Sequence, residues 1–179
     1  MTEIDTTFHK LPAALLLATL VLLSSAAAAQ TEIVGHAKAV SGDTVRIKSI
    51  ENGKVSTIRL FGVDAIELNQ HCETKLGVPK NCGRFSRDAL GAMLRRKLVT
   101  CVDFDRGPDG EKTATCYAGD VILNAAIVRA GWALAFSFDT NDYQGLENLA
   151  KKEGRGNWPY RFQKPWNWRA DRADEQKGN

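Results

Sequence analysis

The sequence has few prolines, no internal repeat and no low-complexity block, and its 179 residues contain a single long apolar run. Hydrophobic residues make up 44% of the chain and charged residues 25%, with 15 Gly and 5 Pro. This composition excludes a disordered chain, a collagen-like chain and a membrane protein with several spans. With three histidines and no CxxC spacing among its four cysteines, the sequence gives little support to a zinc site. A globular domain is the class that remains.

The long apolar run, Leu11–Leu23, is followed by an alanine-rich stretch in which Ala27 and Ala29 form a small-x-small processing site. This pattern predicts a signal peptide over residues 1–29, cleaved after Ala29, and hence a periplasmic or secreted protein. The acidic residues that precede the run are untypical of a signal peptide. An uncleaved membrane anchor stays open as an alternative, because residues 11–29 are close to the length that spans a bilayer.

Cleavage would leave 150 residues with a formal net charge of +4, and all four cysteines lie among them. The mild basic excess permits a polyanionic partner without requiring one. An even number of cysteines after a signal peptide indicates disulfides formed in an oxidising compartment. Three pairings are possible. Pairing of sequence neighbours is the simplest expectation, with Cys72 joined to Cys82 around a loop and Cys101 joined to Cys116 across a hairpin.

The first part of the mature chain alternates between apolar and polar side chains, which is the two-residue period of a strand. We expect strands at Ile33–Val40, Asp43–Ile50 and Val55–Val63, with the Asn52-Gly53 pair forming a tight turn between the last two. Three strands in a meander therefore precede any helix. A polar loop over residues 68–81 follows them.

The second part of the chain mixes helical and strand patterns. Apolar spacing predicts helices at Arg84–Arg96, Leu123–Ala130 and Asn141–Glu153. Two more strands are expected at Leu98–Phe104 and Lys112–Tyr117. Five strands and three helices favour an α+β fold that is mainly β, a five-stranded barrel of the OB type. We expect one domain over residues 30–169 and a charged, frayed tail over residues 170–179.

Acidic and basic side chains gather around the second and third predicted strands: Asp43 begins the second, Arg59 lies in the third, and Asp64 and Glu67 follow it. Because the start of one antiparallel strand lies beside the end of the next, Asp43 and Asp64 could converge. Two carboxylates and a backbone carbonyl suit a hard cation such as Ca²⁺. An arginine beside them would bind a phosphate, and a third carboxylate would activate a water. Taken alone, acidic residues at strand ends are more often solvated or capping groups.

A longer series of motifs runs in order through residues 33–169. It closely resembles the thermonuclease (staphylococcal nuclease-like) family and its secreted bacterial members. The resemblance implies an OB-fold barrel with helices, and Ca²⁺-dependent hydrolysis of DNA and RNA to 3′-phosphorylated products. The motifs are SGDTV at 41–45, RLFGVDAIE at 59–67, NCG at 81–83, ATCYAG at 114–119, LN at 123–124, VRAGWA at 128–133, GRGNW at 154–158 and PWNWR at 165–169.

Carried over by position, the resemblance implies a role for each residue of the acidic group. Asp43 and Asp64 would be Ca²⁺ ligands, joined by the carbonyl of Ala65. Glu67 would be the carboxylate that activates water. Arg59 would be one of two arginines that stabilise the pentacoordinate phosphorus.

The second arginine is missing from the position where the family has it. Glu111 stands there, and Asp109 replaces a tyrosine two residues earlier. An arginine that completes a phosphoryl-transfer site is worth about 10³–10⁵ in rate, so we expect slow catalysis. Arg106 and Lys112 are the nearest basic residues that could compensate, although Lys112 should point to the other face of its strand.

Phe136 and Phe138 stand where family members often have tyrosines that contact the substrate, and they could stack on bases or pack in the core. The aromatic and basic tail over residues 155–169 could likewise stack bases or wrap the barrel. Two functions therefore compete. One is a secreted, monomeric, Ca²⁺-dependent nuclease without membrane association, acting on DNA or RNA. The other is a non-hydrolytic relative that binds a polyanion, either nucleic acid or an acidic exopolysaccharide, with a role in exopolysaccharide (succinoglycan) biosynthesis.

Overall fold

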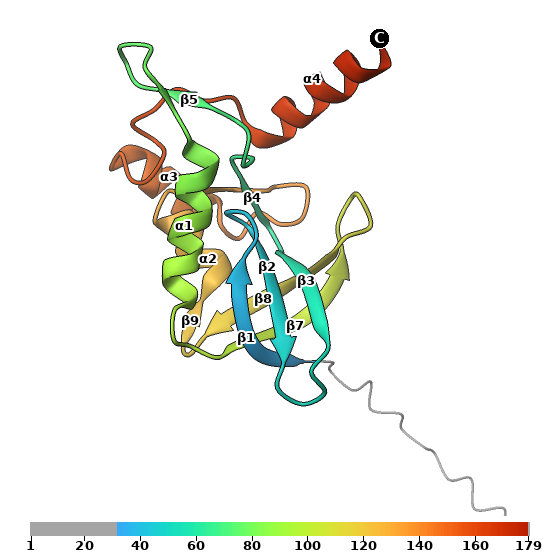
Figure 1. The fold of residues 1–179 in the computed structure, drawn as a ribbon. Coiled ribbons are helices and arrows are strands. Elements are labelled where there is room, and N and C mark those ends of the chain that lie inside the picture. Colours follow the sequence, from blue (N-terminus) through green and yellow to red (C-terminus); the bar gives the residue numbers. More distant parts are fainter. Residues whose placement is uncertain (1–31, 179) are drawn as a thin grey trace, which may run out of the picture.

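A closed barrel of five strands forms the centre of the protein in the computed structural model, which describes residues 32–178 (Figure 1). The strand order is β3-β2-β1-β7-β8, and parallel pairing of β3 with β8 closes the barrel. The predicted fold class is confirmed. The barrel strands are β1 (Ile33–Ala39), β2 (Thr44–Ser49), β3 (Val55–Leu60), β7 (Val99–Arg106) and β8 (Lys112–Ala118), with the short β9 (Val121–Ile122) beside β8.

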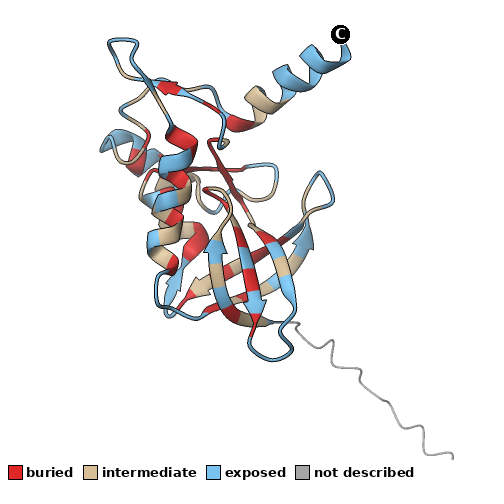
Figure 2. Cartoon of the chain, in the orientation of Figure 1, coloured by how far each residue is buried: buried red, intermediate tan, exposed pale blue. Residues whose placement is uncertain are grey.

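The core of the barrel follows from the alternation seen in the sequence. In β2, Val45 and Ile47 are fully buried, whereas Arg46 and Lys48 are exposed. The same alternation buries Ile58 and Leu60 in β3. One face of each strand is therefore apolar and turned inward, and the outer face is free to carry charge (Figure 2).

The third predicted strand, Val55–Val63, is shorter than predicted, because a turn at Phe61 and Gly62 divides it. β3 ends at Leu60, and the next strand, β4 (Val63–Ala65), leaves the barrel sheet to pair with β10 (Ala133–Ala135). Gly62 has a φ of 73°, a left-handed conformation that glycine adopts readily. The turn carries Asp64 away from β3 to the end of the barrel where the site lies.

Helices pack beside the barrel and continue past one end of it. The three predicted helices correspond to α1 (Cys82–Leu94), α2 (Leu123–Arg129) and α3 (Gln144–Lys152). A fourth, α4 (Pro165–Lys177), is absent from the prediction and includes most of the tail expected to be frayed. Pro165 starts it, at a position where proline is favoured because no helical N–H is needed. The far half of α4 projects from the domain and is exposed (Figures 1 and 2).

Two disulfides join sequence neighbours, as predicted. Cys101 and Cys116 face each other across β7 and β8. Cys72 and Cys82 connect β5 (Cys72–Glu73), which pairs with β6 (Pro79–Lys80), to the start of α1. A small second core forms at this disulfide around Ile66, and Tyr160 and Phe162 of the tail pack against it. Part of the aromatic and basic segment over residues 155–169 therefore packs on the domain and covers this second core. Among residues 32–178, no helix has both the length and the apolarity needed to cross a membrane.

Candidate active site

One end of the barrel carries a pocket of about 620 Å³ that contains most of the site residues predicted from the sequence. Five segments meet there: the β1–β2 turn, the end of β3 with β4, the β7–β8 turn, the segment after β10 and the first turns of α4. The pocket is lined by Ser41, Asp43, Thr44, Arg59, Asp64, Glu67, Pro108, Asp109, Glu111, Phe136, Phe138, Trp166, Asn167, Arg169 and Ala170.

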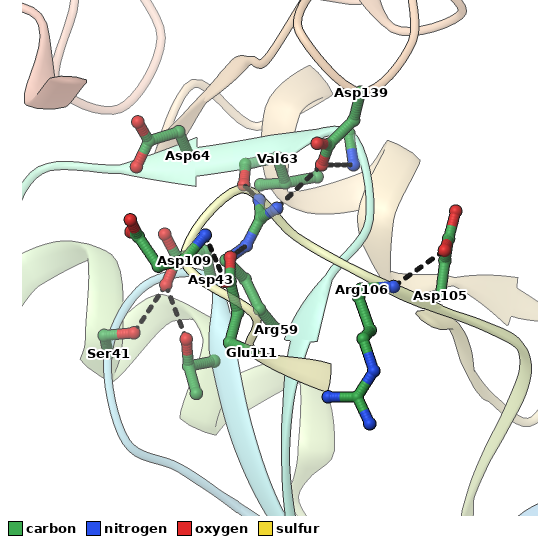
Figure 3. A network of polar contacts seen from close by, with 12 residues as sticks. Ser41, Asp43, Arg59, Val63, Asp64, Asp105, Arg106, Asp109, Glu111 and Asp139 are labelled. Carbon is green, nitrogen blue, oxygen red and sulfur yellow. Dashed lines mark hydrogen bonds and ion pairs between the residues drawn. The ribbon is translucent and has the colours of Figure 1, made fainter. Parts of the chain in front are cut away.

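Asp43 is held rigidly at the bottom of the β1–β2 turn. Its Oδ1 accepts hydrogen bonds from the hydroxyls of Ser41 (2.5 Å) and Thr44 (2.9 Å) (Figure 3). Its Oδ2 accepts one from the backbone N–H of Ala65 (2.9 Å). Gly42 allows this close approach, because a Cβ there would lie 2.7 Å from the Cβ of Ala65. Three hydrogen-bond donors therefore determine where the Asp43 carboxylate lies.

Asp64 lies beside Asp43 and is almost completely buried. Burial raises the pKa of Asp64 to about 6, and the negative charges of Asp43 and Glu67 act in the same direction, whereas Arg169 lowers it. Asp43, Asp64 and Glu67 all line this pocket, so the structure brings these three carboxylates together. Ala65, the predicted carbonyl ligand, is buried in β4 and is not among the residues that line the pocket.

A guanidinium from α4 occupies the space between Asp64 and Glu67. Arg169 donates from Nη1 to Asp64 Oδ1 (2.9 Å) and to Glu67 Oε1 (2.6 Å), and from Nη2 to Asp64 Oδ2 (2.8 Å). We call Arg169, Asp64 and Glu67 the helix cluster. Within the described residues, Glu67 Oε2 accepts no hydrogen bond, so this oxygen is available to take a proton.

Arg59 is bound by two other carboxylates at the opposite side of the pocket. Its Nε donates to Glu111 Oε1 (2.7 Å), its Nη2 to Asp139 Oδ2 (2.8 Å) and its Nη1 to the carbonyl of Val63 (2.9 Å) (Figure 3). We call Arg59, Glu111 and Asp139 the barrel cluster. Burial acts to lower the pKa of Arg59, but the charges and hydrogen bonds of Asp139 and Glu111 outweigh it and raise the pKa.

Glu111 occupies the position where the family has its second arginine. Here its carboxylate forms an ion pair with the first arginine, Arg59. Partial burial acts to raise the pKa of Glu111, but hydrogen bonds from its own backbone, from Arg59 and from Asp109 lower it below the usual range. Glu111 is therefore anionic at neutral pH. The two predicted substitutes lie elsewhere: Arg106 turns away from Arg59 and bonds the carbonyl of Gly110 (Figure 3), and Lys112 lies over the ring of Phe104.

The aromatic residues form one wall of the pocket. Phe136 is buried, packs on Trp166 with 5.7 Å between ring centroids, and lies under the guanidinium of Arg59 at 5.3 Å. Phe138 also lines the pocket but is 74% exposed. Phe136 therefore supports the arginine, whereas Phe138 is the ring that is free to stack on a base.

The pocket is acidic overall, with five carboxylates and two guanidinium groups among its lining residues. Among residues 32–178, no three His, Cys, Asp or Glu side chains are arranged as a ready metal site. The donor set nevertheless suits a hard cation, since it offers carboxylate oxygens in a buried position. The guanidinium of Arg169 stands in for a cation there, because it neutralises the same oxygens that a metal ion would use.

The sequence contains no sign of Asp139, and it indicates Trp166 and Arg169 only as members of the aromatic and basic tail. Asp139 lies 80 residues from Arg59, and Arg169 lies 105 residues from Asp64. Arg169 belongs to the aromatic and basic tail over residues 155–169, and no rule of sequence spacing brings that tail to the pocket. Only the tertiary arrangement of α4 reveals it.

A small β-barrel whose mouth carries clustered carboxylates and arginines defines a nuclease-type OB-fold domain. Residues 57–160 match the family described as "Staphylococcal nuclease homologue". A "Succinoglycan biosynthesis protein ExoI" of Rhizobium meliloti (strain 1021) is 31% identical over 145 residues, which are 79% of this chain and 72% of that protein. An "Uncharacterized endonuclease" of Escherichia coli O157:H7 is 30% identical over 136 residues, 74% of this chain and 81% of the relative. The chain belongs to the staphylococcal nuclease homologue family, and the predicted family is confirmed.

Proposed function

We propose that the protein is a secreted, Ca²⁺-dependent nuclease-like phosphodiesterase that hydrolyses DNA or RNA slowly. One observation carries the proposal: Asp43 of the β1–β2 turn and Arg59, Asp64 and Glu67 of the segment from β3 to just after β4 line a single pocket. The family and the relatives named as endonucleases support the same reaction class.

Different residues of the pocket have different roles in the proposed reaction. Asp43 and Asp64, which line the pocket, would hold Ca²⁺, which when bound would offset the negative charge of the phosphodiester. Glu67 takes a proton from water through its unbonded Oε2 as the water oxygen attacks phosphorus. The bond from phosphorus to the leaving 5′-oxygen then breaks, this oxygen takes a proton from solvent to become a hydroxyl, and the phosphate stays on the 3′ side.

Two arginines can still bind phosphate oxygens in this pocket. A guanidinium carries five N–H groups, and Arg59 and Arg169 each use three in the contacts described above. Each keeps two for a phosphate. We propose that Arg169 supplies the second guanidinium in place of a residue at position 111. Because Arg169 bonds both oxygens of Asp64, Ca²⁺ must displace part of that contact, which contributes to slow catalysis.

The experiment is cleavage of a fluorescent single-stranded DNA with Ca²⁺ and with EDTA. We expect slow cleavage with Ca²⁺, none with EDTA, and a loss of at least about 10³-fold in Asp43→Ala, because its carboxylate is a proposed metal ligand. Asp120→Ala is the matched control, since Asp120 is exposed and lies outside the pocket. Equal cleavage by wild type and Asp43→Ala would contradict the proposal.

The second candidate is a non-hydrolytic protein that binds a polyanion. The ion pair between Glu111 and Arg59 favours it, because that pair withdraws charge from a phosphate-binding group. The relative named for succinoglycan biosynthesis extends the candidate partner to an acidic exopolysaccharide. Retention of an oligonucleotide or a polysaccharide without any cleavage, also in Glu111→Arg, would favour this candidate over the nuclease.

A periplasmic or extracellular location forms part of the proposal, as does a monomeric state. The two disulfides support an oxidising compartment. The predicted leader lies outside the described residues. Expression of the full chain in a bacterium and N-terminal sequencing of the periplasmic fraction tests it, and a mature N-terminus at Gln30 is expected.

A further inference from the structure

A second hollow lies on the other side of the β1–β2 turn from the active-site pocket. It has a volume of about 470 Å³ and is formed by β1 and α1, which lie side by side in Figure 1. Lys38, Arg87, Arg95, Arg96 and Lys97 line it, and the single acidic residue in its lining is Asp88. Asp88 is paired with Arg87 at 2.7 Å. The hollow is therefore strongly basic, in contrast to the acidic pocket.

The outer surface of the adjoining strands extends this positive charge. Lys38 of β1 lies directly opposite Arg46 of β2, and His36 lies opposite Lys48. All four side chains are exposed. Like charges in directly opposed positions destabilise a strand pair, so the pairing of Lys38 with Arg46 is an arrangement that stability alone does not favour.

Apart from Arg87, the basic residues of the hollow and of the adjoining strands form no ion pair within the part of the chain that the structure describes. Among residues 32–178, the ion pairs do not include Lys38, Arg46, Lys48, Arg95, Arg96 or Lys97. We call these six residues the basic face. Arg96 has a φ of 59°, a conformation that residues other than glycine adopt rarely. An arginine is thus kept at a position where glycine would fit more easily.

The position of the basic face connects it to the active site. Lys38 and Ala39 line the hollow, while Ser41 and Asp43 of the same turn line the pocket. A nucleic-acid or polysaccharide strand that crosses the β1–β2 turn would pass from the basic hollow into the active-site pocket. The pocket itself carries more negative than positive groups, so it does not attract a polyanion on its own. An adjacent positive surface would supply that attraction and raise the local concentration of a polyanionic substrate.

We infer that the basic face binds the phosphate backbone of a single nucleic-acid strand and leads it across the β1–β2 turn to the pocket. This inference rests on the proposed function in that it takes nucleic acid as the partner. Contacts of this kind, lysine and arginine with phosphates, hold a strand without reading its sequence, and their strength falls steeply with salt.

The test measures binding separately from cleavage. A fluorescein-labelled 30-nucleotide single-stranded DNA is titrated with the Asp43→Ala protein in EDTA, and anisotropy is followed between 50 and 200 mM NaCl. Adding Lys38→Gln, Arg95→Gln and Lys97→Gln should weaken binding by about tenfold at the lower salt. It should also reduce the slope of log affinity against log salt by about 2, the value for three phosphate contacts on a single strand.

The matched control neutralises three exposed lysines away from the basic face, Lys75, Lys152 and Lys177, so that both proteins lose the same charge. Equal affinity of the two triple variants would overturn the inference, even if the wild type cleaves DNA. Salt-sensitive binding of alginate but not of DNA would also overturn it and assign the face to an acidic polysaccharide. Failure of cleavage with the expected DNA binding intact would instead count against the proposed nuclease alone.

Discussion

The two halves of the pocket are built alike but fixed differently. In the barrel cluster, Arg59 binds Asp139, whose side chain is 6% exposed, and the more open Glu111; in the helix cluster, Arg169 binds Asp64, 3% exposed, and the more open Glu67. The arginines themselves differ, since the side chain of Arg59 is 13% exposed and that of Arg169 is 39% exposed.

This difference follows from the elements that carry the two arginines. Arg59 comes from a barrel strand that is hydrogen-bonded on both sides, by β2 and by β8. Arg169 comes from a helix that projects from the domain. The barrel cluster therefore holds its guanidinium in place, whereas the helix cluster can release its guanidinium to a competing cation or to a phosphate.

The largest expected effect is in the barrel cluster. Arg59→Gln removes a phosphate-binding guanidinium and leaves Asp139 buried without its partner. We expect cleavage to fall by about 10³-fold and the free energy of unfolding to fall by about 3 kcal/mol. Urea unfolding and DNA cleavage measure the two losses. A variant that keeps full stability would show that the barrel cluster is no more fixed than the helix cluster.

A pH titration sharpens the description of the helix cluster. The pKa of Asp64, about 6 in the folded protein, exceeds its ordinary value of 3.8, so the folded state binds the proton more tightly than the unfolded state. The stability that Asp64 contributes is then present below pH 3.8 and is lost as the pH rises through 6. In EDTA, wild type should lose about 2 kcal/mol relative to Asp64→Asn between pH 4 and 7.

The readout for that titration is urea unfolding at each pH, with Asp120→Asn as the control that should parallel the wild type. Parallel curves for wild type and Asp64→Asn would mean that Asp64 titrates as an ordinary surface carboxylate. The helix cluster would then lack the desolvated acidic group on which its proposed affinity for a cation depends.

A smaller effect is expected from position 111. Glu111→Arg removes the carboxylate that competes with phosphate for Arg59 and adds a guanidinium to the barrel cluster. We expect the cleavage rate to rise by about tenfold. This gain is smaller than the full contribution of a catalytic arginine, because the substitution also removes the ion pair that Glu111 forms with Arg59. Glu175→Arg, at an exposed position of α4, changes the charge equally and should leave cleavage as it is.

The sequence predicted Arg59 of the barrel cluster and Asp64 and Glu67 of the helix cluster as site residues, but it predicted neither Asp139 nor the contact of Arg169 with Asp64, for physical reasons. The alternation of Val45 and Ile47 with charged residues reports burial directly, and the place of Arg59 in its strand follows from the same period. The sequence did not predict the turn at Gly62 that ends β3, since a two-residue period does not reveal a left-handed turn. The sequence did not predict the contact of Arg169 with Asp64, because the helix that carries Arg169 has a weak apolar pattern and the two residues are 105 positions apart.

The most direct measurement compares single-turnover DNA cleavage by wild type, Arg169→Gln, Glu111→Arg and the double variant, at saturating Ca²⁺. If Arg169 supplies the second guanidinium, Arg169→Gln should lower the rate by about tenfold, and adding Glu111→Arg should restore it to the wild-type rate or above. A faster Arg169→Gln variant, or a double variant as slow as Arg169→Gln alone, would contradict that assignment.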